Sequence, residues 1–348
     1  MEDLIPRIAT YIGAKLNIPA NDITITDFSR IPGGASRETY KFRASWTDKA
    51  GKSFDKPLIL RRDPTGSLID TDREIEFAAF QTYYGTKVPV PEALWLEQDE
   101  GPLDRPFFMM EQIEGGSVGN PFNKGGGYGD HADKLGEQFW PILGHIAALD
   151  PEAANLSPAF QRIEADKCWE KELDYWANEI ATHQLEPQPV AEAAIRWLRR
   201  NPPPPAQAVR VVHGDYRTGN FLFNDQGDII AVLDWEMAHL GDPLEDLCWA
   251  LDPLWCVFEP EKPGNMIERA RALELWQQAS GLTIDPVALE WWEVFSMVKG
   301  LGIWITGAYE YETGDNKAPI LGFSAWWCTD THNRLLADRL KQISEKEG

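Results

Sequence analysis

The sequence lacks the features that would place it in several common protein classes. It has only four cysteines and no C-x-x-C pair, which argues against a zinc knuckle or a thioredoxin-type motif. Its first residues contain no basic segment followed by an apolar run, so we expect no signal peptide. The longest apolar stretch, residues 294–308, is too short to span a membrane and contains a lysine. We therefore expect a cytoplasmic protein with no membrane partner.

Positive charge is also scarce. Lys and Arg number 33 against 55 Asp and Glu, which gives a formal net charge of −22. Nucleic-acid-binding surfaces are basic, so we expect no nucleic-acid partner. An acidic surface supports solubility and would also attract a cationic small molecule. The 348 residues are 43% hydrophobic, which is enough for two domains or one bilobal unit with a large core. No feature of the sequence predicts an oligomeric state.

One segment carries most of the chemistry. Residues 211–220 read Val-Val-His-Gly-Asp-Tyr-Arg-Thr-Gly-Asn, and residues 233–236 read Leu-Asp-Trp-Glu. Between them, two short apolar runs are joined by Asn-Asp-Gln-Gly, which predicts a β-hairpin. An antiparallel pair brings its two open ends together, so Asn220 should lie near Asp234. Asp215 lies just upstream, on the loop that leads into the hairpin.

This arrangement suits phosphoryl transfer. The spacing His-x-Asp-x-x-x-x-Asn matches that of a kinase catalytic loop. We predict that Asp215 orients an acceptor hydroxyl and takes its proton. Asn220 and Asp234 are predicted to hold Mg²⁺ against the phosphates of ATP, or alternatively GTP, because Mg²⁺ prefers oxygen ligands. His213 is expected to shape the loop, since phosphoryl transfer has no separate task for it.

The same residues resemble the aminoglycoside phosphotransferase-like (choline kinase-like) family. Together with Gly-Asp-Pro-Leu-Glu-Asp-Leu at residues 241–247, they are most similar to phosphotransferase domains related to those fused to acyl-CoA dehydrogenases. The resemblance implies an α+β, bilobal, protein-kinase-like fold with a small β-rich N-lobe and a larger α-rich C-lobe. Residues 1–114 would form the nucleotide-binding lobe and residues 115–348 the catalytic and substrate-binding lobe. Asp246 would tie its helix to the 213–220 loop.

The N-terminal third carries the expected phosphate-covering loop. Residues 28–42 predict a strand, a turn and a second strand. Backbone N–H groups of Gly33, Gly34 and Ser36 would cover the phosphates. The loop is not a Walker A motif, because no Gly-Lys-Ser/Thr follows.

The next strand, residues 57–62, departs from the usual pattern of the fold. The resemblance implies a phosphate-binding lysine here, but the sequence offers Arg61, with Arg62 as the alternative. Arginine can still bind phosphate through two parallel hydrogen bonds. A helix starting near residue 72 would supply the ion-pair partner of Arg61. We assign that role to Glu74, with Glu76 on another face as the alternative.

The remaining predictions concern the hinge and the helices. Residues 107–115 read as a buried strand running into a hinge, and the resemblance implies that backbone groups of Glu111 and Ile113 meet the adenine. Helices are predicted at residues 165–183, 188–200, 264–280, 286–308 and 319–343. Five tryptophans are either core residues or apolar walls of the acceptor pocket: Trp291, Trp292, Trp304, Trp326 and Trp327.

We therefore predict an ATP-dependent phosphotransferase whose acceptor is a hydroxyl of a small molecule, aminoglycoside-like or another metabolite. Two other functions stay open at this point. A non-catalytic nucleotide-binding module would explain the arginine in place of lysine. A metal-dependent hydrolase would use His213, Asp215 and His239 as ligands, although the six histidines are scattered.

Overall fold

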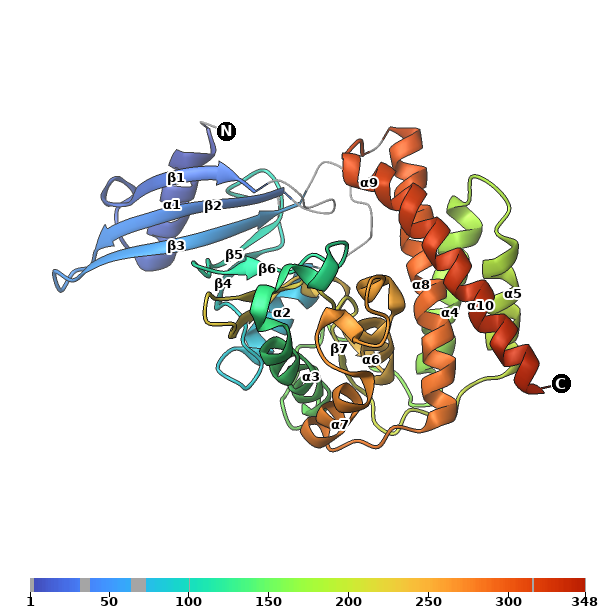
Figure 1. The fold of residues 1–348 in the computed structure, drawn as a ribbon. Coiled ribbons are helices and arrows are strands. Elements are labelled where there is room, and N and C mark those ends of the chain that lie inside the picture. Colours follow the sequence, from blue (N-terminus) through green and yellow to red (C-terminus); the bar gives the residue numbers. More distant parts are fainter. Residues whose placement is uncertain (1–2, 32–37, 64–72, 100, 315, 348) are drawn as a thin grey trace.

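The computed structural model describes residues 3–31, 38–63, 73–99, 101–314 and 316–347 (Figure 1). Gly33, Gly34 and Ser36 lie outside these ranges. The described chain divides into an antiparallel sheet near the N-terminus and a larger helical part, shown on the left and right of Figure 1. The predicted α+β architecture, with a small β-rich part and a larger α-rich part, is confirmed.

The N-terminal sheet has five strands in the order β1-β2-β3-β5-β4, and every neighbouring pair is antiparallel. The strands are β1 (Thr24–Arg30), β2 (Glu38–Thr47), β3 (Ser53–Arg62), β4 (Ala93–Glu97) and β5 (Phe107–Glu111). Successive side chains of a strand point to opposite faces. Tyr40, Phe42 and Leu60 therefore pack beneath the helix α1 (Leu4–Leu16), in a core of their own. The opposite face of the sheet is turned toward the rest of the molecule.

That second face carries the helix α2 (Arg73–Tyr83). Phe77 and Phe80 of α2 pack on Phe108 of β5, with ring centroids 5.9 and 6.2 Å apart. Tyr83, at the end of the same helix, stacks on Trp235 at 4.8 Å. Trp235 lies just beyond the predicted hairpin, so α2 joins the sheet to the segment that carries Asp234.

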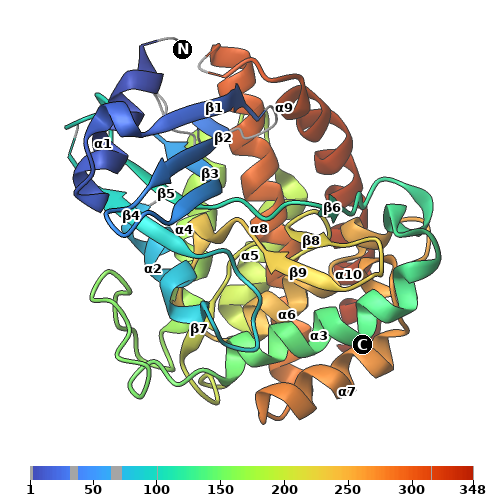
Figure 2. The ribbon, with the colours of Figure 1, turned by 90° about the vertical axis from the view of Figure 1, so that its left-hand side faces the viewer.

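The predicted hairpin is present as β8 (Phe221–Phe223) and β9 (Ile229–Val232), with β6 (Ser117–Val118) at its edge. Figure 2 shows it below and to the right of the five-stranded sheet. A second pair joins β7 (Arg210–Val212) to β10 (His239–Gly241), and the 213–220 loop leads from β7 into β8. The loop therefore starts on one strand pair and ends on another, which fixes the positions of both its ends.

Helices, joined by loops and short 3-10 turns, make up most of the rest of the described chain. They are α3 (Ala132–Ala148), α4 (Cys168–His183), α5 (Pro189–Arg200), α6 (Leu244–Leu251), α7 (Arg269–Ser280), α8 (Pro286–Thr313), α9 (Pro319–Phe323) and α10 (Thr329–Glu347). The long helices α8 and α10 lie side by side (Figure 1). Within the described ranges, no helix combines the length and the apolar character needed to cross a membrane.

Close packing of α8 against α10 depends on a glycine. A Cβ at Gly300 would lie 2.1 Å from Cε1 of His332, whose ring is held by Asp252 and Trp304. Gly300→Ala should therefore lower the free energy of unfolding by about 1–3 kcal/mol, the usual cost of overpacking. Urea denaturation measures this change.

The matched control is Gly307→Ala on the same helix. Its Cβ would meet Leu321 at 3.4 Å, an ordinary contact. Alanine favours a helix over glycine by up to about 1 kcal/mol, so this variant should be as stable as the wild type or more stable. Equal urea midpoints for the two variants would contradict the packing described for Gly300.

Candidate active site

The structure brings Asp215, Asn220 and Asp234 together, as the hairpin predicts. The side-chain amide of Asn220 donates to the main-chain oxygen of Asp215 at 2.8 Å and to its Oδ2 at 2.6 Å. The N–H of Leu233 donates to the carbonyl of Asn220 at 2.8 Å, which places Asp234 beside the loop. All three line one cavity of about 680 Å³. The roles assigned to them remain predictions.

The 213–220 loop is anchored from beneath by α6. Asp246 accepts hydrogen bonds from the backbone N–H groups of His213 and Gly214, at 2.5 and 2.9 Å. It ties its helix to the loop, as the resemblance implied. Burial raises the pKa of this carboxyl to about 6, while the bond from His213 acts against that rise.

His213 acts as part of this scaffold. Its ring is fully buried, with Nε2 2.9 Å from the carbonyl of Leu233, and its Nδ1 accepts the N–H of Asp215 at 3.2 Å. Nδ1 must therefore carry no proton, and the ring is neutral. Burial lowers the pKa of His213 to about 4, although the nearby carboxylate of Asp215 acts in the opposite direction. A neutral ring with both nitrogens occupied shapes the loop.

The carboxylate of Asp215 is held by more residues than the sequence indicates. Its Oδ1 accepts from the indole of Trp249 at 2.8 Å and from Nε of Arg217 at 2.9 Å. The Arg217 guanidinium lies 4.8 Å from the centre of the Trp255 ring. Trp249 is 34 residues further along the chain, on α6, and nothing in the local sequence points to it.

Arg61, rather than Arg62, faces this cavity. Because the two are neighbours on β3, they point to opposite faces. Arg62 binds Glu38 at 2.7 Å on the α1 side. Nη2 of Arg61 lies 3.1 Å from Asp234. Burial lowers the pKa of the Arg61 guanidinium, but the surrounding carboxylates outweigh this effect and raise it.

The assignment of Glu74 as the partner of Arg61 is wrong, and the alternative, Glu76, is correct. Nη1 of Arg61 lies 2.8 Å from Glu76, which is fully buried. Glu74 instead accepts a hydrogen bond from Gln98. Two residues of a helix span about 200° of rotation, so only one of these acids can face the sheet. The sequence does not determine which one.

Oxygen ligands for a divalent cation are present. The Asn220 amide donates through nitrogen to Asp215, which leaves its Oδ1 as the available acceptor. Glu236 also lines the cavity, 3.7 Å from Arg61. Burial disfavours a charged Asp234, but Arg61 outweighs that effect and lowers the pKa of this carboxyl. One amide oxygen and nearby carboxylate oxygens fit the preference of Mg²⁺.

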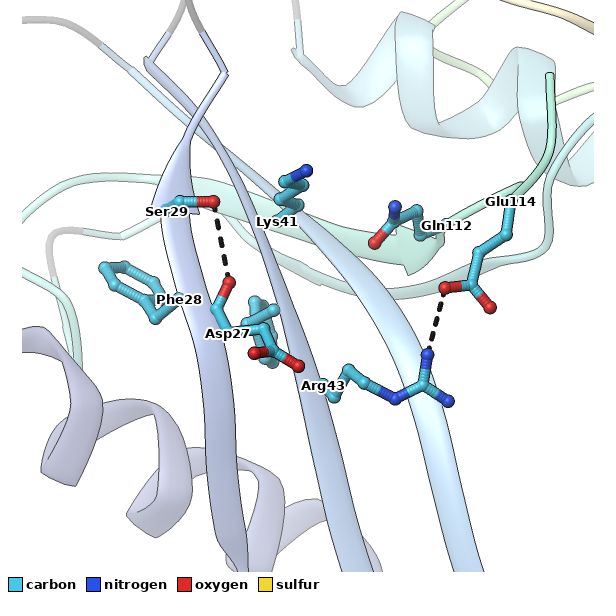
Figure 3. Close-up of a pocket in the computed structure, with 8 residues that line it drawn as sticks. Asp27, Phe28, Ser29, Lys41, Arg43, Gln112 and Glu114 are labelled. Carbon is cyan, nitrogen blue, oxygen red and sulfur yellow. Dashed lines mark hydrogen bonds and ion pairs between the residues drawn. The ribbon is translucent and has the colours of Figure 1, made fainter.

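A second cavity, of about 740 Å³, lies against β1 and β2, beside the predicted hinge (Figure 3). Lys41 and Gln112 line it, and Arg43 forms an ion pair with Glu114 at 2.9 Å. The predicted contact of the hinge with adenine would place the base beside this cavity.

The backbone of the hinge limits how a base could bind. The N–H of Glu111 donates to Glu92 at 2.9 Å and that of Gln112 to Pro57 at 3.0 Å. The N–H of Ile113 has no backbone acceptor in the part of the chain that the structure describes. Glu111 could thus offer only its carbonyl and Ile113 its N–H. Their contact with adenine remains a prediction.

Away from Arg61, the first cavity is walled mainly by aromatic and aliphatic side chains, with Asn120, Glu179 and Arg217 among the polar ones. Of the five tryptophans singled out from the sequence, Trp304 lines it. Trp291 and Trp292 are buried in the core, and Trp326 is 72% exposed. The pattern missed most of the aromatic wall, which consists of Phe122, Tyr175, Trp176, Trp249, Trp255, Trp304 and Phe323.

The predicted hydrolase ligands do not converge. His239 lies 3.1 Å from Glu245 and 3.5 Å from Glu172, whereas the His213 ring is occupied by Leu233 and Asp215. In the described residues, the group with metal-ligand spacing consists of Glu172, His239 and Glu245, and it includes neither His213 nor Asp215. His213, Asp215 and His239 therefore do not form the metal site that the hydrolase alternative requires.

Comparison with known proteins identifies the family. A model of the phosphotransferase enzyme family matches residues 27–282, and the chain belongs to that family. Acyl-CoA dehydrogenase family member 10 of Mus musculus is 28% identical over 220 residues, which cover 62% of this chain and 19% of the mouse protein. Family member 11 of Homo sapiens is 25% identical over 225 residues, covering 62% of this chain and 28% of the human protein. The match thus spans less than a third of either relative, and the resemblance to this branch is confirmed.

Solved structures support the fold. A Ralstonia eutropha protein assigned to the aminoglycoside phosphotransferases has a TM-score of 0.73 at 18% identity, covering 96% of this chain and 98% of its own. The aminoglycoside phosphotransferase APH(4)-Ia, in ternary complex with AMP-PNP and hygromycin B, has a TM-score of 0.58 at 14% identity, covering 95% and 98%. The GDP complex of aminoglycoside 2'-phosphotransferase-IIIa has a TM-score of 0.60 at 15% identity, covering 99% and 100%. The bilobal kinase-like fold is therefore confirmed.

The buried His213 predicts a pH dependence of stability. Unfolded histidine has a pKa near 6.5, and in the folded protein that pKa is about 4. Between these values the unfolded chain binds the proton more strongly, so the free energy of unfolding falls as the pH is lowered. Between about pH 7.5 and 5 this group should account for on the order of 2 kcal/mol.

His213→Gln should remove that part of the pH dependence, as measured by urea unfolding at both pH values. Burial raises the pKa of Asp242 and of Asp246 to about 6, which acts in the opposite direction. Both residues are present in the wild type and in the variant, so their effects largely cancel. Equal pH dependences in the two proteins would show that His213 is not buried as a neutral ring.

Proposed function

We propose that this member of the phosphotransferase enzyme family transfers the γ-phosphate of ATP, or alternatively GTP, to a hydroxyl group of a small molecule. The observation that carries the proposal is the convergence of Asp215, Asn220 and Asp234 on one cavity, beside a buried Arg61. Residues 1–114 would hold the nucleotide and residues 115–348 the acceptor. Solved relatives of the same fold bind AMP-PNP or GDP, which supports a nucleotide as the phosphate donor.

In this mechanism Asp215 orients the acceptor hydroxyl and takes its proton. The acceptor oxygen bonds to the γ-phosphorus, the bond from that phosphorus to the bridging oxygen breaks, and the nucleoside diphosphate leaves. Trp249 and Asn220 fix the carboxylate for this step through the hydrogen bonds described above. Alignment of the reacting groups accounts for much of the rate enhancement in such reactions.

The phosphates would be held from both sides. Arg61, fixed by Glu76 and Asp234, would brace them from the sheet, while backbone groups near Gly33, Gly34 and Ser36 would cover them. Asn220 and Asp234 would hold Mg²⁺, with Glu236 close by. The bound cation would neutralise charge on the phosphates.

The walls of the acceptor cavity favour an acceptor with an apolar skeleton over a polycationic amino sugar. Away from the proposed phosphate site, the acidic side chain lining it is Glu179, which lies 3.3 Å from His183. Several unpaired carboxylates would be needed to hold an amino sugar, whereas aromatic rings suit a carbon chain. The names of the dehydrogenase relatives bring an acyl thioester into consideration. We therefore propose a hydroxyl carried on an apolar, acyl-like chain.

Asp215→Asn should strongly slow phosphate transfer while ATP binding persists. The substitution keeps the shape of the side chain and removes the group that takes the proton, so we expect the rate to fall by about 10²–10⁴-fold. Coupled release of ADP in the presence of acceptor measures the rate, and calorimetry measures ATP binding. The matched control is Asp225→Asn, in the exposed turn of the hairpin, which should behave as the wild type.

Three further results bear on the proposal. Asp234→Asn should raise the Mg²⁺ concentration required for half-maximal rate. Undiminished transfer in the Asp215 variant would overturn the proposed mechanism. Nucleotide binding without transfer to any acceptor would instead favour a non-catalytic module.

Acceptor preference forms a separate prediction. A panel should include medium-chain hydroxyacyl thioesters, the corresponding free hydroxy acids and amino sugars such as hygromycin B. We expect the highest kcat/KM for the acyl-chain acceptors. Trp304→Ala should raise KM for them by about tenfold, because one wall of the cavity is lost, with ATP affinity unchanged. A preference for amino sugars, unaffected by this substitution, would contradict the proposed acceptor class.

A further inference from the structure

A buried lysine that the proposed mechanism does not use lies directly behind the 213–220 loop. Lys299, in the middle of α8, is 1% exposed. A lysine is almost never fully buried unless its charge is paired. Its ammonium donates to the carbonyl of Gly214 at 2.6 Å and to Oε1 of Glu245 at 2.8 Å. It therefore contacts the residue that precedes Asp215.

Gly214 is a sensitive point of the loop. Its φ is +85°, and a Cβ there would lie 2.4 Å from the carbonyl oxygen of Met237. Its N–H is taken by Asp246 at 2.9 Å, while its carbonyl is taken by Lys299. That carbonyl belongs to the peptide unit joining Gly214 to Asp215. A contact that fixes the peptide plane also fixes the direction in which the Asp215 side chain leaves the backbone.

Lys299 also approaches Asp215 by a second route. Its ammonium lies 5.4 Å from the centre of the Trp249 ring, and the indole of Trp249 donates to Oδ1 of Asp215 at 2.8 Å. We propose that Lys299 is a positioning residue, which holds the Gly214–Asp215 peptide and the Trp249 ring so that Asp215 faces the acceptor hydroxyl. This inference rests on the function proposed above.

The charge of Lys299 is balanced by a buried cluster. Glu245 lies 3.1 Å from His239, which in turn lies 3.5 Å from Glu172. Burial disfavours the charged form of His239, but Glu172 and Glu245 outweigh it and raise its pKa to about 9. The buried groups Lys299, His239, Glu172 and Glu245 thus carry two positive and two negative charges, while the exposed Lys171 contacts Glu172 from the outside at 3.0 Å. The cluster has the spacing of a metal site, but the lysine and the imidazolium already compensate its carboxylates.

Because the buried cluster is neutral, a variant that keeps its charges balanced can separate an effect on the position of Asp215 from an effect on folding. Lys299→Met alone leaves one carboxylate in excess in the interior, where an unpaired charge can prevent folding. Adding Glu172→Gln restores a balance of one carboxylate and one imidazolium. Glu172→Gln alone is the matched control, since it changes the same cluster at the end that does not touch the loop.

We expect the double variant to be folded, as judged by circular dichroism and a cooperative urea transition. Its kcat should fall by about 10–100-fold, because a misplaced reacting group costs rate, while KM for ATP and acceptor changes less than threefold. Hydrogen exchange should become faster at the backbone amides of residues 213–217. Glu172→Gln alone should keep both the wild-type kcat and the wild-type exchange.

Two results would overturn the inference. One is a folded double variant with wild-type kcat. The other is unchanged hydrogen exchange at residues 213–217, and this readout needs no substrate. If the wild type itself transfers no phosphate, the proposed function fails, while the exchange measurement still decides whether Lys299 fixes the loop.

Discussion

The ion pairs of Arg61 are the constraint on which the site depends. One guanidinium joins β3 to Glu76 of α2 and to Asp234 after β9, at 2.8 and 3.1 Å. In a mostly buried setting such contacts are much stronger than in water, and breaking one leaves a carboxylate without its partner. The sheet, the helix α2 and the hairpin therefore cannot shift independently. Asp234, the proposed metal ligand, is thus positioned by Arg61, the residue proposed to brace the phosphates.

The proposed catalytic carboxylate is positioned by different means. Asp215 lies on an irregular loop, and a loop by itself is a poor platform for precise geometry. Here the loop is held at both ends by strand pairs and from beneath by side chains of two helices. Asp246 and Trp249 come from α6, and Lys299 comes from α8. The rigid helical part of the molecule thus supplies the precision that the loop lacks.

Local sequence patterns predict those parts of the site that are close together in the chain. Asn220 and Asp234 flank one short hairpin, so turn chemistry and strand alternation were enough to bring them together. The choice between Glu74 and Glu76 was different, because it depends on how α2 is rotated against the sheet. The roles of Trp249 and Lys299 could not be predicted from the sequence for the same reason. Each touches the loop through tertiary packing and sits in an apolar helical pattern that looks like ordinary core.

The arginine at position 61 does not by itself indicate a site that has lost its activity. A lysine there would place a single ammonium between α2 and Asp234. Arg61 instead uses two different nitrogens, Nη1 toward Glu76 and Nη2 toward Asp234, so the planar fork spans both elements. Guanidinium is also more weakly hydrated than ammonium, which lowers the cost of burying it. The departure from the family pattern preserves charge and strengthens the link between the elements, so the arginine alone does not support a non-catalytic module.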